Sequence, residues 1–138
     1  MTHEIEPEIE SVVRSLYECL SGLAGAPRDW QRFRGLASPG ARFVRVVTDG
    51  DGRIRARTFD VEEYIADVTP FLREHDFHEM QVGLSVERFG RIAHAWSRYE
   101  ARPRPESSVI LRRGANSIQL WHDDARWWVA SVVWEVQP

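Results

Sequence analysis

Residues 92–102 alternate two sets of side chains, one of which could carry a binding or reacting group into the interior of a sheet. His94 and Trp96 would share one face of a strand, and Ser97 and Tyr99 the other, because successive strand side chains point to opposite faces. An inward Tyr99 hydroxyl could donate a hydrogen bond to a ligand oxygen, although a buried tyrosine is more often satisfied within the protein. His94 is a weak candidate for a general acid or base.

Uncharged polar side chains in the C-terminal part of the chain are suited to orienting a neutral ligand. Asn116, Gln119 and Ser131 stand among apolar residues, where an amide or hydroxyl is tolerated only when it is hydrogen-bonded. These groups could equally bond one another across the sheet. Glu135 is the one carboxylate within the apolar C-terminal segment. It is a candidate general base with a raised pKa, and the alternative is a pairing with an arginine.

No segment of the sequence meets the requirements of a metal site or of a known nucleophile motif. Residues 75–79, His-Asp-Phe-His-Glu, contain four metal-competent side chains, but their spacing fits neither a helix nor a strand, so we expect an exposed, solvated loop. Residues 49–52 predict a turn rather than a calcium loop, because Arg53 stands where an oxygen ligand is needed. We therefore expect no metal and no cofactor, and leave the catalytic residues unassigned.

The composition indicates a single domain, residues 1–138, and narrows its partners. The net charge of −3 is spread along the chain, which favours neither nucleic acid nor an anionic membrane as a partner. All 18 basic residues are arginine, so lysine Schiff-base chemistry is excluded. The chain shows no signal peptide or apolar span and has one cysteine, Cys19, which together predict a cytoplasmic protein.

Hydrophobic periodicity predicts helices first and strands afterwards. Apolar residues recur at helical spacing in three segments, 5–23, 30–36 and 64–72. Asp29 and Asp60 are the expected capping residues of the second and third helices. Residues 41–48 and 53–58 predict a hairpin between these two helices. A period of two follows from residue 78 onward, and this order of elements is typical of an α+β domain.

Four of the six tryptophans lie in the last thirty residues, within a predicted closing hairpin. Trp127 and Trp128 are neighbours on one strand, so one aromatic ring must lie on each face of the sheet. In so short a chain, the helices would cover one face and a second subunit the other. Trp128 and Trp134 have the same parity, and together with Trp96 we assign them to the face that meets the partner.

Five stretches of the chain have the order and sequence character of a known superfamily: residues 10–20, 30–33, 39–43, 61–65 and 126–129. They resemble the nuclear transport factor 2-like superfamily of cone-shaped α+β domains, most of all its small bacterial SnoaL-like branch. The resemblance implies three N-terminal helices packed on a strongly curved, mostly antiparallel sheet, with an early β-hairpin between helices 2 and 3. It also implies an apolar pocket inside the cone and a homodimer formed through the outer sheet face.

The resemblance also implies which side chains reach the pocket. By alignment with the superfamily, Ser97 and Tyr99 would point inward. The expected ligand-binding residues are Trp30, Tyr64, Ser97, Tyr99, Asn116, Gln119 and Ser131. The catalytic tyrosine of ketosteroid isomerases would fall at or beside Leu16, and their two aspartates near Arg45 and near Asn116 or Ser117. None of these positions carries an acid. Tyr17 is one place out of register and is expected on another face of its helix.

Three hypotheses on function follow. The first is a SnoaL-like domain, homodimeric and cofactor-free, with an apolar pocket for a small, mostly neutral organic ligand. The alternative is a cofactor-independent isomerase, hydratase or dehydratase, or epoxide hydrolase of the same fold. In such an enzyme Glu135 or His94 would act as acid or base, and Tyr99 or Asn116 would polarise an oxygen. The second alternative is a structural module without a ligand, because the fold alone does not select among functions.

Overall fold

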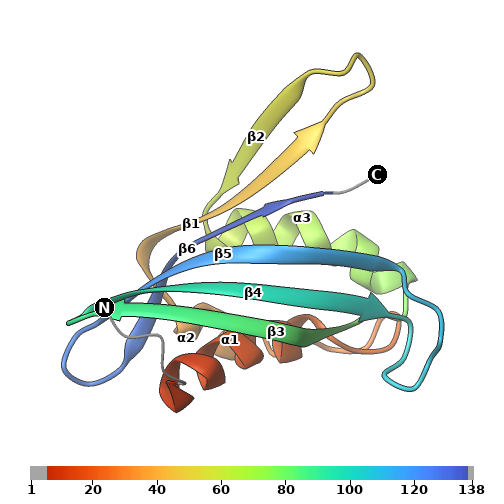
Figure 1. The fold of residues 1–138 in the computed structure, drawn as a ribbon. Coiled ribbons are helices and arrows are strands. Elements are labelled where there is room, and N and C mark those ends of the chain that lie inside the picture. The colour runs from red at the N-terminus through yellow and green to blue at the C-terminus, as the bar shows by residue number, and fades with distance from the viewer. Residues whose placement is uncertain (1–5, 137–138) are drawn as a thin grey trace.

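A computed structural model describes residues 6–136 of the chain, and residue 5, where the predicted first helix begins, lies outside this part. The described residues form three helices and six strands (Figure 1). The helices are α1 (Pro7–Leu20), α2 (Trp30–Leu36) and α3 (Val61–Glu74). The strands are β1 (Ala37–Thr48), β2 (Ile54–Phe59), β3 (His78–Phe89), β4 (Ile92–Arg102), β5 (Arg112–His122) and β6 (Trp127–Glu135). The α+β class predicted from the sequence is confirmed.

The six strands form one mixed sheet in the order β2-β1-β6-β5-β4-β3. All neighbouring strands are antiparallel except β1 and β6, which run parallel. In Figure 1, β1 and β2 turn away from the surface formed by β3, β4 and β5, while the helices lie on one side of the sheet. We call the side that faces the helices the inner face and the opposite side the outer face. The bend of the sheet leaves room for a pocket on the inner face.

Helices α2 and α3 begin at the aspartates that the sequence marks as caps. The Asp29 carboxylate accepts a hydrogen bond from the backbone N–H of Arg32 at 3.0 Å. The Asp60 carboxylate accepts one from the N–H of Glu63 at 2.8 Å, and the Glu63 carboxylate accepts one from the N–H of Asp60 at 2.9 Å. These bonds satisfy N–H groups that have no partner inside the helix, and so they fix where each helix starts.

The core forms where α1 packs on the inner face of the sheet. Its buried apolar side chains are Ile9, Val13, Leu16 and Leu20. The inner positions of β4 include Ala93, Ala95 and Ala101, all 5% exposed or less. These small side chains allow the helix to approach the sheet closely, which removes apolar surface from water and stabilises the fold.

A β-bulge in β6 inverts the alternation of the closing strand. Leu120 pairs with Val129 while the preceding residue of β5, Gln119, pairs with Ser131, so Ala130 is an extra residue in β6. Such an insertion shifts every later side chain to the opposite face. Trp128 therefore lies on the outer face, but Trp134 lies on the inner face, where it packs against Tyr64. The expected position of Trp134 on the partner-facing side is wrong for this reason.

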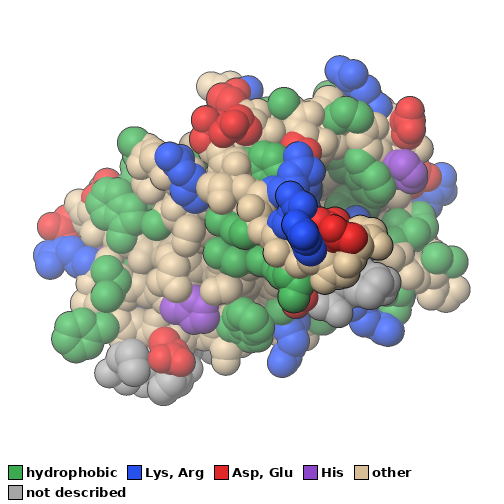
Figure 2. Space-filling model, turned by 90° about the horizontal axis from the view of Figure 1, so that it is seen from above, with side chains coloured by type: hydrophobic (Ala, Val, Ile, Leu, Met, Phe, Trp, Pro, Cys, Tyr) green, Lys and Arg blue, Asp and Glu red, His purple; other side chains and the backbone are tan. Residues whose placement is uncertain are grey.

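The outer face carries large aromatic side chains that are partly exposed to solvent. Trp96 and Trp121 are 44% and 37% exposed, and the Trp121 ring stacks on Trp128 with centroids 6.3 Å apart. Elsewhere on the surface, arginine and acidic side chains lie side by side, as Figure 2 shows for the side of the molecule seen from above.

Within the described residues, no helix is both long and apolar enough to cross a membrane.

Candidate functional site

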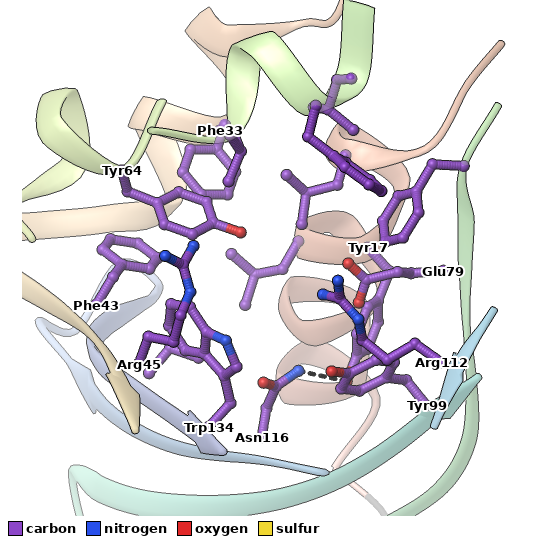
Figure 3. Close-up of a pocket in the computed structure, with 17 residues that line it drawn as sticks. Tyr17, Phe33, Phe43, Arg45, Tyr64, Glu79, Tyr99, Arg112, Asn116 and Trp134 are labelled. Carbon is purple, nitrogen blue, oxygen red and sulfur yellow. Dashed lines mark hydrogen bonds between the residues drawn. The ribbon is translucent and has the colours of Figure 1, made fainter. Parts of the chain in front are cut away.

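A pocket of about 90 Å³ lies between the three helices and the inner face of the sheet (Figure 3). Its apolar lining comes from Leu16, Leu20, Phe33, Phe43, Val68, Phe71, Leu72, Phe77, Val132 and Trp134. Its polar lining comes from Tyr17, Arg45, Tyr64, Glu79, Tyr99, Arg112 and Asn116. A mostly apolar cavity with a few polar groups is the usual form of a small-molecule site.

One wall of the pocket is a cluster of aromatic rings around Tyr64. The Tyr64 ring stacks on Phe43 with centroids 5.0 Å apart, stacks on Phe33 at 5.7 Å, and meets Trp134 edge-on at 5.6 Å. Burial raises the pKa of Tyr64 far above its usual range, so its hydroxyl stays protonated. Figure 3 shows this hydroxyl directed into the cavity, where it can donate a hydrogen bond.

A chain of hydrogen bonds joins α1 to strands β3, β4 and β5 beside the pocket. The Asn116 amide donates to the Tyr17 hydroxyl oxygen at 3.0 Å, and the Tyr17 and Ser97 oxygens lie 2.6 Å apart. Ser97 in turn donates to the Gln81 side-chain oxygen at 2.6 Å, so Tyr17 must be the donor to Ser97. Burial raises the pKa of Tyr17 to about 12, against the opposing effect of these hydrogen bonds. The chain holds Tyr17 and Asn116 in place.

Glu79, the second residue of β3, brings a carboxyl group into the apolar interior. Desolvation raises its pKa from its usual value of 4.5 to about 7, and the positive charge of Arg112 opposes this rise. Within the described residues, no arginine or histidine nitrogen lies within 4.0 Å of its oxygens, and no hydrogen bond reaches them. Every fully buried side-chain oxygen among the described residues has a hydrogen-bond partner. Because the Glu79 oxygens have none, they are not fully buried, and they are accessible from the cavity that Glu79 lines.

Two arginines line the pocket in different states of pairing. Arg45 on β1 binds Asp67 of α3 at 2.6 Å, and its guanidinium lies 5.6 Å from the centroid of the Trp134 ring. Arg112 on β5 lies over Phe77, 5.9 Å from the ring centroid. Among the described carboxylates, none lies within 4.0 Å of Arg112. The charge of Arg112 is therefore balanced only at longer range, by Glu79 at the same end of the pocket.

Tyr99 on β4 lies between the two charged groups Glu79 on β3 and Arg112 on β5. Burial is the main cause that raises its pKa to about 12; the Glu79 carboxylate adds to the rise and Arg112 opposes it. The ring covers Gly114, its partner on β5, where an added Cβ atom would lie 2.6 Å from the Tyr99 hydroxyl oxygen. Glu79, Tyr99 and Arg112 thus form the polar end of the pocket. Tyr64 and its aromatic neighbours form the other end, with the paired Arg45 beside them (Figure 3).

The structure brings together only part of the predicted ligand-binding set. Tyr64, Tyr99 and Asn116 line the pocket. Ser97 is fully buried behind Tyr17 and does not reach the cavity. Trp30 packs edge-on against Phe33 on the far side of the aromatic cluster and lines a separate hollow with Leu72 and Arg73. Gln119 and Ser131 pair with each other on the outer face.

The predicted acid and base candidates other than Tyr99 lie away from the pocket. Glu135 is exposed near the end of β6. His94 lies on the outer face, where its Nε2 is 2.9 Å from the Ser117 hydroxyl. Neither side chain lines the cavity. Acid–base chemistry inside the pocket would therefore depend on Glu79 rather than on these residues.

Sequence reasoning missed Glu79 because a second bulge hides its orientation. Gln81 pairs with Tyr99 and Gly83 with Arg98, so Val82 is an extra residue in β3. The alternation of Leu84 and Val86 on the inner face therefore places residues 79 and 81 inside, whereas an unbroken strand would place them outside. The expected exposed loop at residues 75–79 is wrong from Phe77 onward, because Phe77 is buried and His78 and Glu79 belong to β3. Among residues 6–136, no group of three or more potential metal ligands occurs, at this segment or elsewhere.

Tyr17 and Arg112 were also absent from the predicted site. Tyr17 was expected on another face of α1 from Leu16, but both side chains line the pocket. Because α1 lies on the concave side of the curved sheet, the sheet buries more of the helix surface than the single stripe expected for a helix on a flat sheet. Arg112 follows a proline-containing loop and has no local pattern that marks it as inward. The available signal was an arginine four positions before Asn116, because residues an even number of positions apart on a strand share a face.

No protein-family model and no curated protein matches this chain. Solved structures are similar to it over nearly its whole length. A protein of unknown function with a cystatin-like fold from Nostoc punctiforme has a TM-score of 0.72 and 13% identity, covering 96% of this chain and 90% of that one. A nuclear transport factor 2-like protein of unknown function from Pseudomonas putida has a TM-score of 0.68 and 15% identity, with coverages of 94% and 84%.

A candidate ketosteroid isomerase from Shewanella frigidimarina is also similar, with a TM-score of 0.57, 16% identity, and coverages of 90% and 91%. The chain therefore has the nuclear transport factor 2-like fold, as its sequence pattern indicated. At these identities the similarity defines the fold alone, and the function must be argued from the pocket.

Proposed function

We propose that this chain is a SnoaL-like domain that binds a small, largely apolar organic molecule in the pocket on the inner face. The observation that carries this proposal is the pocket itself, with aromatic rings at one end and Glu79, Tyr99 and Arg112 at the other. Its volume of about 90 Å³ suits a short-chain or single-ring molecule. A purely structural module would fill this space with its own side chains.

Blocking the pocket tests this proposal. Val132→Phe would place a ring in the cavity, and Val109→Phe adds the same ring at a loop position that is 55% exposed. A thermal-shift screen of small ketones, alcohols and carboxylic acids should find compounds that raise Tm in the parent and in Val109→Phe but not in Val132→Phe. Equal ligand stabilisation of both variants, or a screen with no stabilising compound, would refute a ligand pocket.

A second candidate function is cofactor-free proton transfer, favoured by the carboxyl group of Glu79. A carboxyl group with a pKa of about 7 can take a proton from carbon or return it near neutral pH. The protonated hydroxyls of Tyr64 and Tyr99 would donate hydrogen bonds to the substrate oxygen where negative charge develops. Isomerisation and dehydration share this requirement for a base beside hydrogen-bond donors.

Hydrogen–deuterium exchange tests proton transfer without knowledge of the substrate. Small cyclic ketones in D₂O should exchange their α-hydrogens faster with the protein than without it, as followed by NMR. Glu79→Gln should abolish the acceleration, and Glu87→Gln, an exposed position on the same strand, should retain it. Exchange at the buffer rate with the parent protein, or an acceleration that survives Glu79→Gln, would exclude this function.

We also propose a homodimer through the outer face, supported by the exposed rings of Trp96 and Trp121 and by the stacked Trp128. Large aromatic side chains are enriched at the centre of protein interfaces. Sedimentation should show a dimer for the parent and a monomer for Trp96→Glu. Phe89→Glu, at an exposed position at the end of β3, is the control that should remain dimeric. A monomeric parent would contradict the proposal.

A further inference from the structure

The two arginines of the pocket differ in what they can bind. Arg45 already holds the Asp67 carboxylate at 2.6 Å. Arg112 lines the same cavity without a carboxylate within 4.0 Å among the described residues, and its guanidinium lies over the ring of Phe77 and close to Tyr99. A guanidinium in such a position has lost much of its water without gaining an ionic partner, which is unfavourable unless a ligand supplies one.

We propose that Arg112 binds the carboxylate of a small monocarboxylate ligand, and that Glu79 takes up a proton from solvent when this ligand binds. The proposal rests on the proposed ligand pocket and names the class of its ligand. The sequence predicted a mostly neutral ligand. Arg112 instead indicates a charged head group with an apolar body, because a guanidinium and a carboxylate form paired hydrogen bonds of matching geometry.

The uptake of a proton by Glu79 on ligand binding follows from the charged and titratable groups that face it. These groups are Arg112 from β5, Tyr99 from β4, Tyr64 from α3, Tyr17 from α1 and, further across the pocket, Arg45 from β1. The tyrosines are neutral and Arg45 is paired with Asp67, so Arg112 is the cation that balances Glu79. A ligand carboxylate would compete for that same charge. Two carboxylates sharing one cation repel each other, and one of them is protonated.

Protonated Glu79 then becomes a donor rather than a competitor. Its hydroxyl can donate to one ligand oxygen while Arg112 donates to the other. The apolar body of the ligand would lie against the aromatic wall formed by Phe33, Phe43 and Tyr64. Both ends of the pocket are then used, and the small cavity limits the body to a short chain or a single ring.

Paired probes separate this inference from the proposed function. Calorimetric titration would use monocarboxylates from butanoate to benzoate, each beside its primary amide, which has a similar shape without the charge. We expect the carboxylates to bind and the amides to bind more weakly at pH 6. Arg112→Met should weaken carboxylate binding about ten- to hundredfold and leave amide binding unchanged. Arg113→Met, at the adjacent exposed arginine that pairs with Glu100, should change neither.

The pH dependence tests the role of Glu79. Above pH 7, carboxylate affinity should fall toward a limit of tenfold for each pH unit, since binding takes up one proton. Glu79→Gln should remove this dependence and bind carboxylates more tightly than the parent at pH 8.5. Glu87→Gln should keep the parent's dependence. Near-UV circular dichroism of each variant verifies that the fold is intact.

Each failure has a distinct meaning. Amides that bind as tightly as carboxylates, or carboxylate binding that survives Arg112→Met, would overturn the inference and leave the ligand pocket standing. A pH-independent carboxylate affinity in the parent would remove the role of Glu79. Failure of carboxylates and amides alike to bind would overturn the inference and also count against the proposed function, which the wider thermal-shift screen then decides.

Discussion

The inner and outer faces of the sheet treat the same kind of side chain in opposite ways. On the outer face, Glu100 accepts hydrogen bonds from Arg102 at 2.9 Å and Arg113 at 3.1 Å, and these bonds lower the pKa of its carboxyl group. On the inner face, Glu79 has no such bonds among the described residues, and burial raises its pKa to about 7. The two glutamates lie on neighbouring strands. Their surroundings, rather than their residue type, decide which one is available for chemistry.

The aromatic residues show the same division. Phe33 on the inner side is 1% exposed and contacts three other rings, whereas Trp96 on the outer face is 44% exposed. The inner rings stabilise the fold and shape the pocket. The outer rings are free to stabilise an assembly, because much of their apolar surface is still in contact with water.

Truncation of one ring on each face should give the largest difference. Phe33→Ala removes a fully buried ring and should lower the free energy of unfolding by about 3–5 kcal/mol. Trp96→Ala should lower it by about 0.5 kcal/mol, measured by denaturant unfolding at a protein concentration where the chain is monomeric. Similar losses for the two variants would contradict the distinction between a structural inner face and an outer face that is free to associate.

The Glu79 carboxyl group should make the fold less stable as the pH rises. Because its pKa is raised from 4.5 to about 7 in the folded protein, its protonated form favours folding. The associated stability is complete below pH 4.5 and is lost as the pH rises to 7, in total about 3 kcal/mol. The difference in unfolding free energy between the parent and Glu79→Gln, measured from pH 4 to 8, isolates this contribution.

An exposed carboxylate provides the comparison of opposite sign. Hydrogen bonds from Trp128 Nε1 and from the backbone N–H groups of Arg126 and Ala125 lower the pKa of Asp123 from 3.8 to about 2. Its stabilisation is present above pH 3.8 and is lost as the pH falls toward 2. Asp123→Asn should therefore alter the acid limb of the stability curve and Glu79→Gln the limb between pH 4.5 and 7. If Asp123→Asn altered the stability between pH 4.5 and 7 and Glu79→Gln altered it below pH 3.8, both assignments would be refuted.

Much of the fold was predictable from periodicity, and the site was predictable only where strands alternate without interruption. The three helices and the α+β order follow from spacing and from the caps Asp29 and Asp60. On β4, alternation placed Tyr99 on the same face as Ser97, and the resemblance to the superfamily assigned this face to the interior, as the structure shows. Tyr64 and Asn116 were predicted to line a pocket, and they do line the cavity.

Two of the errors fall on the strands that contain bulges. One extra residue, Val82 in β3, brings Glu79 inside, and another, Ala130 in β6, brings Trp134 inside. Gly83, which directly follows Val82, was a local hint of the first bulge, since a glycine within a strand often marks one. No such residue lies next to Ala130, and a bulge is defined by the partner strand. Arg112 was missed for a related reason, since its role depends on Glu79 across the sheet. Long-range pairing therefore determines the chemistry of this pocket, while local sequence determines its frame.

Two glycines offer the smallest test of the same contrast between a packed inner face and an open surface. An alanine Cβ at Gly114 would lie 2.6 Å from the Tyr99 hydroxyl oxygen and 2.7 Å from its Cζ atom, so the ring must move. Gly114→Ala should lower the free energy of unfolding by about 1–3 kcal/mol, the usual cost of overpacking. It should also weaken any ligand that contacts Tyr99.

Gly35→Ala should have the opposite sign. Gly35 lies inside α2, with no atom within 4 Å of an added Cβ. Alanine there reduces the entropy of the unfolded chain and should raise the free energy of unfolding by about 0.5–1 kcal/mol. Denaturant unfolding of both variants measures the pair. A neutral Gly114→Ala would mean that Tyr99 is not held against β5, and the polar end of the pocket would then lack the fixed donor that both proton transfer and carboxylate binding require.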